Sequence, residues 1–131
     1  MLNGILPAKW QGHAHAALRI MTGLLFLQHG SAKLLKFPNI DAMLVGMPSG
    51  MIMATGLVDL IGGILIVIGI YTRSVAFVLS GYMAVGYFMA HAPMGFFPIL
   101  NFGEPAIFFC FIFLYLATAG AGPYSVDDSR K

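Results

Sequence analysis

Charged residues are scarce in this sequence. Only 9% of its 131 residues are Asp, Glu, Lys or Arg, whereas a soluble domain carries roughly 25%. Hydrophobic residues reach 59% and are spread along the whole length. The shortage of charge excludes an ordinary soluble domain. The even spread favours one compact membrane unit over an anchor joined to a soluble domain.

Cysteine is almost absent as well. The single cysteine, Cys110, excludes an intramolecular disulfide and a CxxC redox centre. No ligand set for haem, an iron–sulfur cluster or a metal is evident. Electron transfer would therefore need a cofactor that comes from another molecule, or a partner protein. The net charge of +2 is too small and dispersed to suggest binding to nucleic acid.

The first 13 residues, MLNGILPAKWQGH, do not match a signal peptide. Pro7 and Lys9 interrupt the apolar run, and no small-residue cleavage site follows a short apolar core. Trp10, with Lys9 and His13, is instead typical of an interfacial anchor that leads into a membrane helix.

Four apolar segments predict membrane-spanning helices, each of which needs about 20 residues at ~1.5 Å per residue. Pro38 and Pro93 end the first and third, Ser49 caps the second, and Glu104-Pro105 begins the fourth. We expect spans at about 14–36, 50–70, 74–92 and 104–121, and a short polar tail at 122–131. The predicted fold is all-α, an integral membrane antiparallel four-helix bundle.

Four spans place both termini on the same side of the membrane. That side has more cations than the other, and the positive-inside rule makes it cytoplasmic. The cations on it are Lys9, Arg19, Arg73, Arg130 and Lys131, against Lys33 and Lys36 on the other side. The loops after the first and third helices are therefore expected outside the cytoplasm.

Polar residues interrupt the first span, which holds Arg19, His29 and Lys33. A Lys or Arg near the middle of a span costs roughly 2.5–3.5 kcal/mol on insertion scales, so partners are expected. In antiparallel helices Asp59 shares the depth of His29, ~12 Å below the outer boundary. Lys33 lies one turn above His29 on the same face.

The third and fourth helices bring further polar residues to the same outer half. His91 ends the third helix, Asn101 lies in the loop, and Glu104 begins the fourth helix. We expect these residues to join the polar residues of the first two helices in one pocket, where their charges nearly balance as burial requires. Ionisable residues within a membrane indicate a functional site by default.

Structural roles are alternatives for each of these residues. Lys33 and Asp59 can be a purely structural interhelical pair, and Glu104 can be only a helix cap. Either histidine alone is readily satisfied by a backbone carbonyl or a lipid headgroup. Arg19 and Arg73 are typical of snorkelling residues that fix topology.

Three stretches resemble the DoxX family of small four-helix bacterial membrane proteins. They are RIMTGLLFLQHGSAKLLKF with HGxxKL, VDLIGGILIVIGIYTR with acid–x–x–G–G, and YFMAHAPMGFFPILNFGEPAIFFCFIFLYLATAGAGPYSVD with MAHAP and N–x–GE. The resemblance covers about Leu18 to Asp127. The family often has glutamate where this chain has Asp59, a shorter acid that must approach its partner more closely.

The resemblance implies a place in the bacterial inner membrane and a link to quinone-dependent oxidoreductases. The family is similar to the small subunit of archaeal terminal quinol oxidase and thiosulfate:quinone oxidoreductase, and other members are linked to redox-stress complexes. A quinone would then be the cofactor, and a partner protein would supply electrons. The motifs give these candidates for ligand binding or proton relay: Arg19, His29, Lys33, Asp59, His91, Asn101 and Glu104.

Two interpretations of function remain open. In the first, the chain is the quinone-facing subunit of a redox complex, and no residue is identified as catalytic. In the second, it is a non-enzymatic scaffold or carrier for a lipid-like or amphiphilic molecule. The glycine-rich helix faces are also compatible with a homodimer.

Overall fold

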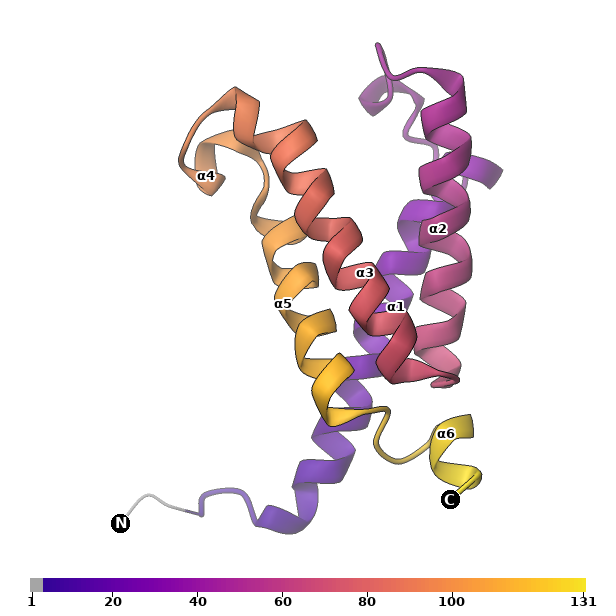
Figure 1. The fold of residues 1–131 in the computed structure, drawn as a ribbon, viewed down its shortest axis with the longest axis vertical. Coiled ribbons are helices and arrows are strands. Elements are labelled where there is room, and N and C mark those ends of the chain that lie inside the picture. Colours follow the sequence, from indigo (N-terminus) through magenta and orange to yellow (C-terminus); the bar gives the residue numbers. More distant parts are fainter. Residues whose placement is uncertain (1–3) are drawn as a thin grey trace. The chain divides into compact units, whose positions relative to one another are not determined.

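The computed structural model describes residues 4–131, and all regular secondary structure within them is helical. Residues 1–3, which begin the stretch compared above with a signal peptide, lie outside the described residues. The backbone divides into two compact units (Figure 1). Unit 1 comprises Met1–Ile70 and Ala121–Lys131, and unit 2 comprises Tyr71–Gly120. The expectation of an all-α chain is confirmed for the described residues.

Unit 1 is built on two antiparallel helices, α1 (Gln11–Leu35) and α2 (Ser49–Ile68). The helix α2 ends at Gly69, whose φ of 71° is the left-handed conformation that glycine adopts most easily. Short helical segments flank the pair. They are η1 (Ala8–Trp10), η2 (Asp41–Met43) and α6 (Val126–Ser129).

Glycines set the close approach of α1 and α2. A Cβ atom at Gly30 would lie 2.6 Å from the Cα atom of Leu60, and one at Gly63 would lie 2.6 Å from the backbone nitrogen of Leu27. Both distances are shorter than real carbon contacts allow, so only glycine fits. Small residues hold membrane helices together in this way, and here they fix the register that places Lys33 opposite α2.

Unit 2 is built on α3 (Thr72–Gly86) and α5 (Glu104–Ala119), which also run antiparallel. A π-helical segment η3 (Tyr87–His91) and a 3₁₀ segment η4 (Ala92–Met94) extend α3, and a single turn α4 (Pro98–Asn101) precedes α5.

Two hydrogen bonds fix the pairing of α3 with α5. The Nη1 atom of Arg73 donates to the carbonyl oxygen of Thr118 at 2.5 Å. Further along, the Oγ atom of Ser80 donates to the carbonyl oxygen of Cys110 at 2.8 Å.

Within residues 4–131, two helices are long and apolar enough to cross a membrane, judged by length and composition. They are Ser49–Ile68, with 20 residues, and the continuous helix Thr72–Met94, with 23 residues. The first helix has 25 residues but is interrupted by polar side chains, and the apolar α5 has only 16. Four membrane spans arranged as one bundle therefore stay a prediction.

Candidate functional site

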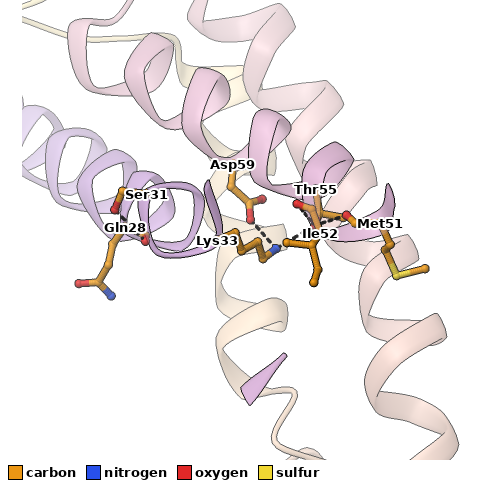
Figure 2. A network of polar contacts seen from close by, with 7 residues as sticks. All are labelled: Gln28, Ser31, Lys33, Met51, Ile52, Thr55 and Asp59. Atoms are coloured by element: carbon orange, nitrogen blue, oxygen red, sulfur yellow. Dashed lines mark hydrogen bonds and ion pairs between the residues drawn. The ribbon is translucent and has the colours of Figure 1, made fainter. Parts of the chain in front are cut away.

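The side chains of Lys33 and Asp59 form an ion pair between α1 and α2. The Nζ atom of Lys33 donates to the Oδ2 atom of Asp59 at 2.8 Å and to the Oγ1 atom of Thr55 at 3.1 Å. Figure 2 shows the lysine nitrogen lying beside both oxygen atoms. Because Thr55 and Asp59 are four residues apart, they lie on the same face of α2. The sequence-based expectation that Lys33 has a partner is confirmed.

This ion pair is largely buried, although part of it is exposed at the surface. The side chain of Asp59 is 5% exposed and that of Lys33 is 14% exposed. Thr55 donates its own hydroxyl hydrogen to the carbonyl oxygen of Met51 at 2.7 Å, so its oxygen is oriented to accept from Lys33. An ammonium group has three N–H donors, and these two contacts use two of them. One donor is therefore left for another acceptor.

His29 lies one turn before Lys33 on α1, and its side chain is exposed. Gln28, its neighbour, points away from the ion pair (Figure 2). The structure therefore places His29 on the surface next to Lys33, while the enclosed part of the site consists of Lys33, Asp59 and Thr55. Thr55 was not among the candidates, because a threonine in an apolar helix carries no distinctive signal.

Arg19 lies at the opposite end of α1 and is completely buried. Fourteen residues separate it from Lys33, which corresponds to about 21 Å along a helix. Its guanidinium group donates five hydrogen bonds, all to backbone carbonyl oxygens. The acceptors are Ala121 at 2.9 Å, Ile66 at 3.1 Å, Val67 at 2.5 Å, Pro123 at 3.1 Å and Tyr124 at 2.8 Å.

These contacts make Arg19 an internal connector of unit 1. The carbonyl groups of Ile66 and Val67 belong to the last turn of α2, where no intrahelical donors remain and the helix dipole is negative. The other three acceptors belong to the segment that follows Gly120. All five guanidinium donors are used. The snorkelling interpretation of Arg19 is therefore wrong, since its charged end lies among carbonyls inside the protein.

In unit 2, Asn101 is fully buried and organises the turn before α5. Its Nδ2 atom donates to the hydroxyl oxygen of Tyr87 at 3.0 Å and to the carbonyl oxygen of Gly95 at 2.9 Å. Its Oδ1 atom accepts from the backbone nitrogen of Gly103 at 2.8 Å. Both of its N–H donors are thus used within the protein, which is the pattern of a structural residue.

His91 lies beside Asn101, at the end of the π-helical segment. Its Nδ1 atom is 2.9 Å from the carbonyl oxygen of Asn101. A carbonyl group only accepts, so Nδ1 carries the hydrogen, and in the neutral ring Nε2 is an acceptor. The ring stacks with Tyr87 at a centroid distance of 6.1 Å. π-Helical turns are frequent at functional sites.

Glu104 is the first residue of α5, and its side chain is exposed. A carboxylate in the first turn interacts favourably with the positive end of the helix dipole. The structure thus brings Lys33 together with Asp59 in unit 1, and His91 together with Asn101 in unit 2. Their assembly into a single pocket stays a prediction. No cluster of three or more metal-ligating side chains occurs among residues 4–131.

Comparison with known protein families identifies one that matches this chain. The DoxX family model matches residues 14–92, a range that includes Arg19, His29, Lys33, Asp59 and His91. A protein of Haemophilus influenzae, described as uncharacterized, is 38% identical over 130 aligned residues, which cover 92% of each chain. No solved structure matches the chain.

Proposed function

Since the chain belongs to the DoxX family, we propose that it is a multi-pass protein of the bacterial inner membrane that binds a quinone headgroup beside Lys33. Its helices form a four-helix bundle in the bilayer. It acts as an accessory subunit of a membrane redox complex, in which a partner protein supplies the electrons. The same bundle can assemble as a homodimer through its glycine-rich faces.

The composition of the helix surfaces supports the membrane location. Two helices meet the length and hydropathy required for a span. Large apolar side chains are exposed on every long helix, including Leu24 on α1, Ile61 on α2, Phe77 on α3 and Phe111 on α5. Water would disfavour so many exposed apolar groups, about 25 cal/mol for each Å², whereas lipid chains cover them without cost.

The observation that carries the ligand proposal is the partly exposed side chain of Lys33. Asp59 and Thr55 hold its ammonium group in position and use two of its three N–H donors, which leaves one for a ligand. A charged donor in an apolar environment binds a carbonyl oxygen more strongly than a neutral donor does. A quinone headgroup presents such an oxygen on an otherwise apolar ring, so the residues fit the group.

Asp59 has a second role in this proposal. Its carboxylate fixes the ammonium group of Lys33 at 2.8 Å and compensates its charge, which burial requires. The same carboxylate is within reach of a proton held by Lys33. A bound quinone would supply two-electron, two-proton chemistry, and the protein's own contribution is to orient one carbonyl oxygen and to hold a proton nearby.

A binding titration tests the proposal, with purified protein in lipid nanodiscs and a short-chain ubiquinone as the probe. We expect saturable binding that weakens at least about tenfold in Lys33→Met, because a hydrogen bond to a charged group contributes about 1.5–3 kcal/mol. The matched control is Lys36→Met, since Lys36 is three residues away, exposed, and paired only with the surface residue Asp41 at 3.4 Å. Wild-type protein without saturable binding, or equal binding by Lys33→Met, would contradict the proposal.

A double substitution separates a ligand site from a purely structural pair. Lys33→Met alone leaves Asp59 without its cation, so folded yield should fall. Combining it with Asp59→Asn removes both charges and should restore much of that yield. We expect the double variant to fold and still fail to bind ubiquinone. A double variant that binds as well as wild type would show that the pair is only structural.

The ultraviolet spectrum of an organic extract of the purified protein distinguishes the redox function from a carrier function. The extract should contain quinone if the redox proposal is right. Lipid alone in the extract would favour a non-enzymatic carrier or scaffold for an amphiphilic molecule.

A further inference from the structure

The turn that connects η4 to α5 exposes an unusual number of large apolar side chains. We call residues 94–102, MGFFPILNF, the aromatic loop. Its large apolar residues are between 58% and 86% exposed: Met94, Phe96, Phe97, Ile99, Leu100 and Phe102. Residues 74–103 contain no Asp, Glu, Lys or Arg. Contiguous exposed apolar patches of this kind mark binding surfaces rather than surfaces in contact with water.

Several backbone groups of the aromatic loop are hydrogen-bonded within the protein. The backbone nitrogens of Leu100 and Asn101 both donate to the carbonyl oxygen of Phe97, at 2.9 and 3.0 Å, and that of Gly95 donates to Ala92 at 3.1 Å. Loops in water form such turns too, but their remaining backbone groups can bind water. In lipid, by contrast, backbone polar groups must be satisfied internally.

The buried side chain of Asn101 completes this pairing. It accepts from the backbone of Gly103 and donates to the carbonyl oxygen of Gly95, at opposite ends of the loop. The backbone carbonyl of Asn101 is in turn paired with His91. These polar groups of the loop are thus paired within the protein, whereas its large aromatic and aliphatic side chains are exposed.

The elements on either side of the aromatic loop indicate how deep in the membrane the loop can lie. The helix Thr72–Met94, which leads into the loop, is apolar enough to cross a membrane. Glu104, which follows the loop, is exposed and charged, so it requires water or lipid headgroups. The loop between them therefore belongs near the boundary between headgroups and acyl chains, where aromatic side chains are enriched.

We propose that the aromatic loop is a lipid-binding wedge that inserts its outward side chains into one leaflet of the bilayer. It anchors the α3–α5 pair at the membrane surface, with Asn101 holding the inserted backbone in shape. Insertion of about 5–10 Å is typical of interfacial segments. The inference rests on the proposed membrane location but not on quinone binding.

Tryptophan fluorescence tests the wedge in vesicles of brominated phosphatidylcholine, which quenches only side chains in contact with acyl chains. The single native tryptophan is removed by Trp10→Phe, and Phe96→Trp or Phe97→Trp is then introduced. Phe77→Trp, at an exposed position in α3, is the control for lipid contact. Ser129→Trp, in the polar tail, is the control for water.

We expect both loop variants to lose emission as strongly as Phe77→Trp, with bromine near the headgroups more effective than bromine near the chain ends. Quenching of Phe77→Trp alone would overturn the wedge and leave the membrane location intact. If every position behaves like Ser129→Trp, both proposals fail. If the loop tryptophans are quenched neither by bromine nor by aqueous acrylamide, then protein covers the loop, either a second copy of this chain or a partner. That outcome would overturn lipid binding.

Discussion

Arg19 and Lys33 are two cations within one apolar helix, and the protein compensates them differently. Lys33 has a carboxylate partner and a partly exposed side chain. Arg19 has five carbonyl acceptors and no exposed surface. The fixed fork of a guanidinium group suits several acceptors at once, which an ammonium group cannot match. Arg19 is therefore a structural residue, whereas Lys33 retains capacity for a ligand.

Replacing Arg19 by lysine should destabilise the protein. Lysine has three donors, so at least two of the five carbonyl groups lose their partner, and the α2 terminus loses its contact with the C-terminal segment. We expect a loss of about 2–6 kcal/mol, because each of two buried carbonyl groups left unpaired costs about 1–3 kcal/mol, measured as a lower thermal unfolding midpoint in detergent. Arg73→Lys is the control, since Arg73 is exposed and donates to Thr118. Equal midpoints for the two variants would contradict the structural role of Arg19.

At this scale the sequence predicted one pairing and missed another. The pairing of Lys33 with Asp59 is predictable because opposite charges at similar depth on adjacent antiparallel helices are expected to form an ion pair. The partners of Arg19 carry no such signal, since every residue has a carbonyl group. Two of these carbonyls end α2 and three follow Gly120, so only the tertiary structure identifies them.

Helix packing in unit 1 depends on glycines that repeat at intervals of seven residues. Gly23 and Gly30 lie on α1, and Gly56 and Gly63 lie on α2. Every seventh residue returns to nearly the same face of a helix, so each helix presents a continuous groove of small residues. The backbones approach closely there, and the ion pair near the end of the groove is held in register.

Alanine should have opposite effects at packed and open glycines. Gly30→Ala and Gly63→Ala place a methyl group against the backbone of the partner helix, so we expect a loss of about 1–3 kcal/mol. Gly81→Ala in α3 meets nothing within 4 Å and should raise stability by up to about 1 kcal/mol, because alanine favours the helix. Thermal unfolding in detergent measures both. A Gly30→Ala protein as stable as Gly81→Ala would contradict close packing of α1 on α2.

The sequence predicted where these helices begin more accurately than which kind of helix forms. Prolines and glycines punctuate the chain strongly, so α2 begins within one residue of the expected start and α5 begins at the expected residue, Glu104. The π-helical segment Tyr87–His91 was not predicted. Its first and last residues, Tyr87 and His91, both contact Asn101, and local propensity does not describe such tertiary contacts.

For the whole chain, contacts within unit 1 bear on membrane topology. The hydroxyl group of Tyr124 lies 3.1 Å from the Nδ1 atom of His13, and Gly12 lies next to Pro123. The start of α1 and the C-terminal segment therefore lie at the same end of unit 1. This end also holds the buried Arg19 and the last turn of α2. In the proposed membrane arrangement, a chain whose two ends meet in this way crosses the bilayer an even number of times.

Reporter fusions test the topology. We expect green fluorescent protein fused after Lys131 to fluoresce, because the positive-inside rule places both termini in the cytoplasm. Alkaline phosphatase fused after Gly46, between α1 and α2, should be active, because that enzyme folds only outside the cytoplasm. The same enzyme fused after Gly120 should be inactive, which controls for expression of the fusion. An active phosphatase after Gly120 together with a dark C-terminal fusion would reverse the orientation. Activity after Gly46 and Gly120 alike would contradict the odd number of spans proposed between these two positions, and with it the even number proposed for the whole bundle.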